Sequence, residues 1–435
     1  MPDSEDIIRD DREHVWHPFT WMPGYLAEES LVITAAEGVF LVAADGTRYL
    51  DGISSMWLNV HGHARAEIAE AIATQAKAFA HVSLFGQTHA PAATLARRLV
   101  EIAPAGLTHV FYTDDGATAV EVALKLAFQS AQLRGETKRT RFVALEHAYH
   151  GDTIGAVSVG DIEHFHHAFR PLLFDCIRTP APVGYPFHDE AAGSAARERA
   201  LAALERIFET RADEVCAFIL EPVVQGAAGM LIHPEGYLAG ARKLCTKYGV
   251  PMIADEVFTG FGRTGRMFAC EREGVSPDLL CLAKGLTGGT VPLAVTLATE
   301  SIYNAFTGDD PARATFFHGH SYCANPVGCA AALASLDLFK KDGTLGNVAR
   351  LEGLFIEAAA CFRRLPGVTD ARCVGLVFAV DVTRAKEVCA AAKRRGLLIR
   401  PLGDVVYLVP PLVTSEDELT RMIRILYDAL TEVNG

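Results

Sequence analysis

The chain has 435 residues, half of which are hydrophobic, and a formal net charge of −13 at pH 7. This length exceeds what one ordinary core accommodates, so we expect two or three packed subdomains. The negative charge repels phosphate backbones, so nucleic acid is not an expected partner. No apolar run reaches the roughly 18 residues that span a bilayer, so we expect no membrane partner either.

The expected location is cytoplasmic. The first 13 residues are acidic and polar, unlike a signal or transit peptide. The ten cysteines contain no CxxC pair and lie mostly in apolar stretches, which favours thiols in a reducing compartment over disulfides. The same spacing argues against structural zinc, so we expect no metal.

The N-terminal 50 or so residues differ in pattern from the centre of the chain. Residues 31–33 and 39–42, with a turn at 44–46, predict a small antiparallel unit. Beyond them, short apolar runs alternate with longer helical patterns, which favours a mostly parallel sheet covered on both faces. The predicted strands of this sheet are residues 108–112, 141–145, 216–221, 250–255 and 279–283, with 291–298 as a further candidate.

The last third opens near residue 327 with a long Ala-rich helix and continues with predicted strands at 374–381 and 405–408. We therefore expect an α/β fold with a large central domain over residues 61–326. Residues 1–60 and 327–435 would form a smaller α+β domain from both chain ends.

Two polar residues end neighbouring predicted strands. Asp255 ends one strand and Lys284 follows the next, and the carboxyl ends of parallel strands meet at one edge of a sheet. Pyridoxal 5′-phosphate (PLP) chemistry needs a lysine that forms an imine with its aldehyde and a carboxylate that keeps its pyridine nitrogen protonated. Taken singly, Asp255 could cap a helix and Lys284 could be solvated. The fully apolar run before Lys284 and the glycines after it favour the functional interpretation of the pair.

Three further segments carry weaker signals. Residues 114–118 form a glycine turn at a helix start, which suits an anion. Tyr149 could lie flat on a cofactor ring or pack in the core. His150 could be a ligand or a packed histidine, and we favour a packed one. The loop 317–322 could accept a phosphate or only lead into the next helix.

Together these segments resemble the class III (ornithine-type) aminotransferases of PLP fold type I, over about residues 16–411. The most specific match is "DEVFTGFGRTG" followed by "SPDLLCLAKGLTGG". Within the family the sequence is most similar to the branch that converts 8-amino-7-oxononanoate to 7,8-diaminononanoate in biotin biosynthesis. The segments behind this similarity are "WHPFT", "DGISSMWLNVHGH", "THAPA", "YHGDTIGAVSVG", "EPVVQGAAGM" and "RPLGDVVYLVPP".

The resemblance implies a role for each matching residue around the cofactor. The catalytic residues would be Lys284, which binds the cofactor and moves the proton, Asp255, which pairs with the pyridine nitrogen, and Tyr149, which covers the ring. Gly116 and Ala117 would offer amides to the phosphate.

Members of the family form their sites across a dimer, so the resemblance implies a homodimer with shared active sites. His320 and Ser321 would then reach the phosphate from the neighbouring subunit. The small-molecule amino donor and keto acceptor would bind at Phe19, Met56, Trp57, Tyr149, Lys284, Gly319 and Arg400. Arg400 would be the carboxylate clamp.

Three positions depart from the family's commonest pattern. Ala117 stands where a serine or threonine usually binds phosphate, and Met56 replaces the first of two tryptophans. Phe19 replaces a tyrosine whose hydroxyl contacts substrate in the enzymes that use S-adenosylmethionine. The donor is therefore S-adenosylmethionine or lysine, and Phe19 favours lysine. The alternatives are another class III ω-aminotransferase, acting on ornithine, 4-aminobutyrate or a diamine, and a PLP-binding protein without turnover.

Overall fold

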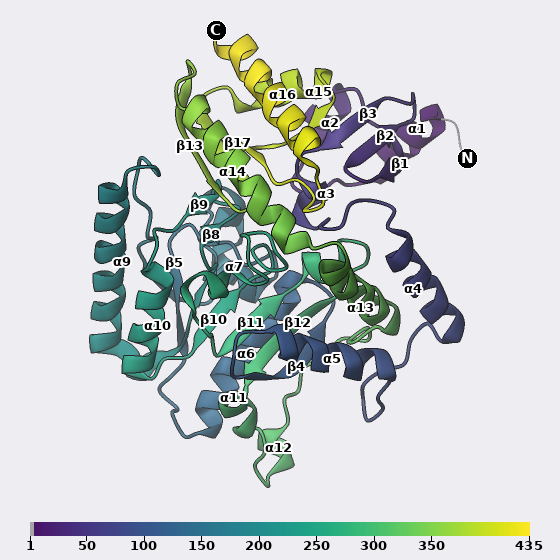
Figure 1. Cartoon of the computed structure of the whole chain (residues 1–435). Helices are drawn as coiled ribbons and strands as arrows, with labels where there is room; N and C mark the ends of the chain where they lie inside the picture. The colour runs from purple at the N-terminus through teal and green to yellow at the C-terminus, as the bar shows by residue number, and fades with distance from the viewer. Residues whose placement is uncertain (1–3) are drawn as a thin grey trace.

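A seven-stranded sheet forms the centre of the computed structural model, which describes residues 4–435 (Figure 1). In spatial order its strands are β4 (Leu107–Thr113), β12 (Ala294–Thr299), β11 (Leu279–Leu282), β10 (Met252–Asp255), β7 (Val215–Leu220), β5 (Arg141–Leu145) and β6 (Cys176–Thr179). All neighbours from β11 to β6 pair in parallel, whereas β12 runs antiparallel to both of its neighbours. The predicted mostly parallel sheet is confirmed. The sequence missed β6, a four-residue edge strand that contains an arginine.

Both faces of the central strands β7, β10 and β11 are buried, which is why these strands are continuous apolar runs. Alternate residues of one strand enter different cores: Phe142 and Ala144 pack with α6 (Gly116–Leu133), and Val143 and Leu145 pack on the opposite face. The helices that contribute to the second core include α5 (Ala90–Ile102), α9 (Glu190–Arg211), α10 (Tyr237–Tyr248), α13 (Pro326–Lys341) and α14 (Thr344–Phe362).

The two ends of the chain meet above this sheet in the view of Figure 1. One small sheet consists of β1 (Ile33–Glu37), β2 (Phe40–Ala43), β3 (Arg48–Asp51) and β15 (Leu397–Leu398), and β15 pairs with β3 in parallel. A second consists of β13 (Val368–Val374), β14 (Val377–Val382), β17 (Val405–Leu408) and β16 (Pro401–Leu402). Helices α15 (Ala385–Arg394) and α16 (Glu416–Asn434) pack against each other beside them. The domain limits at residues 60 and 326 stay predictions.

Two strand predictions at the chain ends were wrong in detail. The first N-terminal strand is Ile33–Glu37 rather than 31–33. The single strand expected at 374–381 is interrupted, because β13 and β14 meet at a tight turn. Gly375 forms this turn at φ +53°, and a Cβ there would lie 2.4 Å from the carbonyl oxygen of Arg263. A side chain at position 375 is therefore excluded by both backbone conformation and space.

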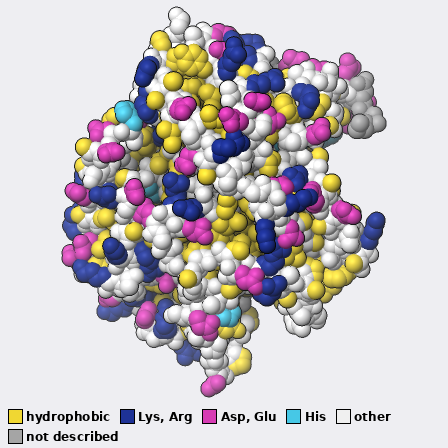
Figure 2. Space-filling view, in the orientation of Figure 1, with side chains coloured by type: hydrophobic (Ala, Val, Ile, Leu, Met, Phe, Trp, Pro, Cys, Tyr) yellow, Lys and Arg dark blue, Asp and Glu magenta, His cyan; other side chains and the backbone are white. Residues whose placement is uncertain are grey.

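The remaining elements are short or peripheral. They include α1 (Ser4–His14), α2 (Met22–Ala27), α3 (Ser54–Trp57), α4 (Ala66–Ala78), α7 (Ile154–Val159), α8 (Glu163–His166), α11 (Glu300–Asn304), α12 (Pro311–Ala314) and the hairpin of β8 (Val224–Gln225) and β9 (Leu231–Ile232). Within residues 4–435, no helix is both long and apolar enough to span a membrane. Figure 2 shows acidic and basic side chains interspersed over one face of the molecule, so the negative charge forms no single patch on that face.

Candidate active site

A cavity of about 700 Å³ opens at the carboxyl edge of the central sheet. Its wall includes Glu221 directly after β7, Asp255 at the end of β10 and Lys284 after β11. Gly116 and Ala117, the first residues of α6, contribute another side of it. The volume lies in the range that cofactor and small-molecule sites occupy, and the position is the one at which open α/β sheets bind ligands.

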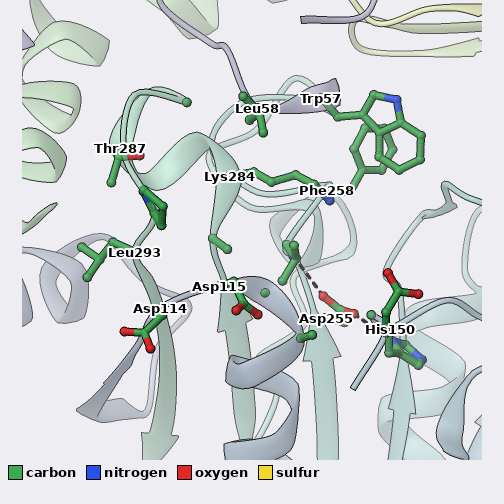
Figure 3. A pocket seen from close by; sticks show the side chains of 18 of the residues that line it. Trp57, Leu58, Asp114, Asp115, His150, Asp255, Phe258, Lys284, Thr287 and Leu293 are labelled. Carbon is green, nitrogen blue, oxygen red and sulfur yellow. Dashed lines mark hydrogen bonds and ion pairs between the residues drawn. The ribbon is translucent and has the colours of Figure 1, made fainter. Parts of the chain in front are cut away.

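Asp255 is buried and held in place by two hydrogen bonds (Figure 3). Its Oδ2 lies 2.7 Å from Nδ1 of the buried His150, and its Oδ1 accepts the amide of Val257 at 3.1 Å. His150 is packed, as the sequence favoured, but it also orients the carboxylate. Sequence reasoning missed this contact because the two residues are 105 positions apart.

Lys284 extends above Asp255 toward Trp57 and Phe258 (Figure 3). Its Nζ lies 5.2 Å from the centre of the Trp57 ring, and its backbone is left-handed, with φ +41°. Desolvation lowers the pKa of the Lys284 amine, against the opposite effect of the nearby carboxylates. A lowered pKa makes more of the neutral amine available, which is the form that attacks an aldehyde or takes up a proton.

The start of α6 is shaped to receive an anion. Asp115 caps the helix by accepting the amide of Thr118 at 2.9 Å, and the amides of Gly116 and Ala117 belong to the first turn, which has no intrahelical acceptors. A Cβ on Gly116 would lie 2.5 Å from Val257 Cγ1, so the close packing of the two loops requires glycine there. The free amides and the helix dipole fit a phosphate group.

Tyr149 lines the same cavity and is held there by hydrogen bonds to two carboxylates. Its amide donates to Glu221 Oε1 at 3.1 Å and its hydroxyl donates to Asp152 Oδ2 at 2.7 Å. Burial and the hydrogen bond to Asp152 raise the pKa of the Tyr149 phenol, so it stays protonated at neutral pH. An amine, a fixed carboxylate, free helix amides and an aromatic ring therefore surround one space, which is the donor set that PLP requires.

Trp57 reaches the cavity from a left-handed turn that the sequence did not predict. All four residues from Ser54 to Trp57 have positive φ angles, between 47° and 83°. Such a conformation costs roughly 1–2 kcal/mol per residue, so it needs compensation. The Ser54 hydroxyl donates to the carbonyl of Val409 at 2.6 Å, and Asp51 Oδ1 accepts the amide of Ser55 at 3.0 Å. Strain stored in this way is common beside functional sites.

Four predicted substrate residues lie outside the cavity lining: Phe19, Met56, Gly319 and Arg400. Arg400 Nη1 lies 3.2 Å from the sulfur of Met56, and Met56 is partly exposed. Phe19 is 55% exposed, but its ring packs 5.2 Å from that of Phe165, which in turn lies 6.3 Å from that of Tyr149. Phe165, which sequence reasoning missed, thus connects Phe19 to the cavity wall.

The loop residues Gly319, His320 and Ser321 do not line the cavity of their own chain. His320 Nδ1 lies 2.8 Å from Oδ2 of Asp114, which does line it. The carbonyl of Ser321 contacts His81 Nε2 at 2.7 Å. Their expected contribution to the site of a neighbouring subunit stays a prediction.

Comparison with known proteins adds four similarities. The family described as "Aminotransferase class-III" matches residues 25–430. The chain is 46% identical, over 100% of both chains, to a Geobacter sulfurreducens protein named adenosylmethionine-8-amino-7-oxononanoate aminotransferase. The solved structure of a protein of that name from Methanocaldococcus jannaschii superposes with a TM-score of 0.93, 40% identity and 99% coverage of both chains. A PLP-bound amine transaminase from an uncultivated Pseudomonas species matches at a TM-score of 0.91 and 34% identity, covering 97% of this chain and 99% of the other. These similarities confirm the expected fold class.

Proposed function

Because this chain belongs to the class III aminotransferases, which are PLP-dependent transaminases, we propose that it transfers an amino group to 8-amino-7-oxononanoate, giving 7,8-diaminononanoate in biotin biosynthesis. The observation that carries this proposal is the 46% identity, over the full length of both chains, to a relative named for that acceptor. The cavity of about 700 Å³ has room for the cofactor and a linear substrate.

Each residue at the base of the cavity would have a separate role in the reaction. Lys284 and Asp255 would hold the aldehyde carbon and the ring nitrogen of the cofactor, and the amides of Gly116 and Ala117 would hold its phosphate. When bound, PLP supplies a carbonyl that links to amines and a ring that takes up the electron pair of the substrate carbon. Lys284 Nζ removes the proton from the amine-bearing carbon of the donor and later delivers a proton to the former ketone carbon of the acceptor.

The donor is S-adenosylmethionine or lysine. Relatives are named for adenosylmethionine. Phe19, which stands in place of a tyrosine, supports lysine. Trp57, Met56 and Phe19 would contact the apolar chains of the substrates, with Gly319 beside them. Arg400, whose closest polar contact is the sulfur of Met56, would pair with a substrate carboxylate.

The proposed active unit is a cytoplasmic homodimer in which His320 and Ser321 complete the partner's phosphate site. Large apolar side chains on and near their loop support this assembly, since Phe317, Tyr322 and Phe85 are all more than 60% exposed. All ten cysteines are free, as a reducing compartment requires. Mixing inactive Lys284→Ala subunits with a Ser321→Asp variant should restore part of the activity; no restoration, once subunit exchange is demonstrated, would contradict the shared site.

A donor screen tests the proposed reaction. The holoenzyme is incubated with 8-amino-7-oxononanoate and S-adenosylmethionine, lysine, ornithine, 4-aminobutyrate or a diamine, and 7,8-diaminononanoate is quantified. We expect product with one of the first two donors. Donor turnover without amination of the oxononanoate would favour another ω-aminotransferase, and no change in cofactor absorbance with any donor would indicate a PLP-binding protein without turnover.

A further inference from the structure

Among the charged side chains that line the cavity, carboxylates outnumber cations. Five of them line it: Asp114, Asp115, Asp152, Glu221 and Asp255. Within the described part of the chain, the one ammonium or guanidinium group in this lining belongs to Lys284. The cavity therefore favours a substrate that carries positive charge near the reacting carbon.

Two of these carboxylates lie at the phosphate side and have partners there. Asp114 contacts His320 at 2.8 Å, and the exposed Asp115 caps α6. A third, Asp152, is exposed and accepts the Tyr149 hydroxyl at 2.7 Å. Water screens the exposed charges of Asp115 and Asp152, and Asp114 is already paired with His320, so these three have limited power to discriminate between substrates.

The two buried carboxylates, Asp255 and Glu221, stand at the ends of adjacent strands, because Leu220 pairs with Ala254. Asp255 has His150 as its side-chain partner at 2.7 Å. Glu221 is 5% exposed, and its hydrogen bonds come from backbone amides: Oε1 accepts from Tyr149 at 3.1 Å and Oε2 from Gly226 at 2.9 Å. Each carboxylate oxygen has lone pairs for a further donor, so Glu221 is fixed in position and can still accept a ligand.

Glu221 therefore lacks the cation that a buried carboxylate needs. Burial, reinforced by the charge of Asp255, raises the pKa of Glu221 to about 8, while Lys284 opposes the rise. A buried charge without a close partner is costly, and a cationic group delivered by a ligand would remove that cost. The adjoining wall suits such a group, since the Trp57 ring already has a cation over its face there, with Lys284 Nζ 5.2 Å from the ring centre.

We propose that Glu221 determines specificity by binding an ammonium group that the substrate carries on the carbon next to its reacting carbon. The inference rests on the proposed function, because 8-amino-7-oxononanoate has an amine beside its ketone. The site would thus select vicinal amino ketones and diamines over ketones and amines that lack the second amine. Glu221 acts on substrate choice, whereas Lys284 and Asp255 act on the chemistry.

The test compares two acceptors that differ only in this amine. With the donor held constant, kcat and KM are measured for 8-amino-7-oxononanoate and 7-oxononanoate in the wild type and in Glu221→Gln. We expect Glu221→Gln to lower kcat/KM for the amino ketone by about 10-fold to 100-fold, mainly through KM, because a charged hydrogen bond is lost. For 7-oxononanoate the change should stay within about 3-fold. An equal loss for both acceptors would overturn the assignment.

Glu256 provides a matched control. It is fully buried, accepts the amides of Ala269 at 2.6 Å and Cys270 at 2.9 Å, and is absent from the cavity lining. Glu256→Gln removes the same kind of charge and should leave the ratio of the two kcat/KM values unchanged. A similar change of that ratio in Glu256→Gln would show that the effect of Glu221 is not local.

The inference can also be tested if neither ketone is a substrate, an outcome that would refute the proposed function alone. The conversion of bound cofactor to its amine form is then followed by absorbance with 1,2-diaminopropane and 2-aminobutane as donors. Faster conversion with the diamine in the wild type, lost in Glu221→Gln, would support amine recognition by Glu221. Equal rates with the two donors in the wild type would overturn it.

Discussion

The base and the mouth of the cavity are built in different ways. At the base, Asp255 and Glu221 are buried at strand ends and held by hydrogen bonds. The proposed mouth comprises Phe19, Met56 and Arg400, which lie outside the cavity lining. Phe19 is 55% exposed, and Arg400 contacts the sulfur of Met56. A rigid sheet edge thus positions the groups proposed to do the chemistry, and loops from distant parts of the chain position the groups proposed to meet the substrate. Changes at the base should therefore cost far more than changes at the mouth.

The largest effect is expected at Lys284. Lys284→Ala removes both the amine that binds the cofactor and the proton carrier, so turnover should fall by at least about 10⁴-fold. The half-reaction with donor, followed by the absorbance of the cofactor, checks this directly. Wild-type rates in the variant would show that Lys284 is not the cofactor lysine.

The next effect is expected at Asp255. Asp255→Asn keeps the size of the side chain but cannot stabilise a charged ring nitrogen, so kcat should fall by about 10³-fold while much of the cofactor stays bound. His150→Asn should cost less, about 10-fold, because Asp255 keeps its bond to the amide of Val257. Near-normal turnover in Asp255→Asn would contradict the role of this carboxylate at the base.

The raised pKa of Glu221 predicts that the stability of the fold depends on pH. Its pKa is about 8 in the folded protein against a reference value of 4.5, so folding favours the neutral carboxyl. The stabilisation is complete below about pH 4.5 and is lost as the pH rises toward 8. The free energy of unfolding of the wild-type apoprotein should therefore fall over this interval, relative to Glu221→Gln, by on the order of 3 kcal/mol. Chemical unfolding at pH 5 and pH 8 measures this, and a constant difference between the two proteins would contradict it.

The smallest effect is expected at the mouth. Phe19→Tyr adds a hydroxyl at a half-exposed position, so stability should change by less than about 0.5 kcal/mol. The ratio of kcat/KM for S-adenosylmethionine to that for lysine should rise by about 10-fold, the value of one polar contact. A wild-type preference for S-adenosylmethionine that is unchanged or weakened in Phe19→Tyr would show that this position does not set donor choice.

Local pattern was sufficient for six of the seven strands of the sheet and for the two residues at its edge. Buried parallel strands must be continuous apolar runs, and their carboxyl ends must share one edge, so Asp255 and Lys284 could be placed together from the sequence. The short edge strand Cys176–Thr179 was not predicted from the sequence, because a partly exposed edge strand needs no continuous apolar run. The turn at Gly375 was not predicted, because the neighbouring residues in the sequence do not distinguish a turn from the interior of a strand.

Tertiary structure alone decided the contacts that complete the site. His150 orients Asp255 across 105 positions, and the amide of Tyr149 donates to Glu221 across 72. The left-handed turn at Ser54–Trp57 exists because Val409, from the other end of the chain, accepts a hydrogen bond from Ser54. The sequence by itself predicted the residues that are proposed to carry the chemistry, since their types and strand-end positions are local properties. The partners that hold them are set by packing between distant segments, which leaves no local pattern to read.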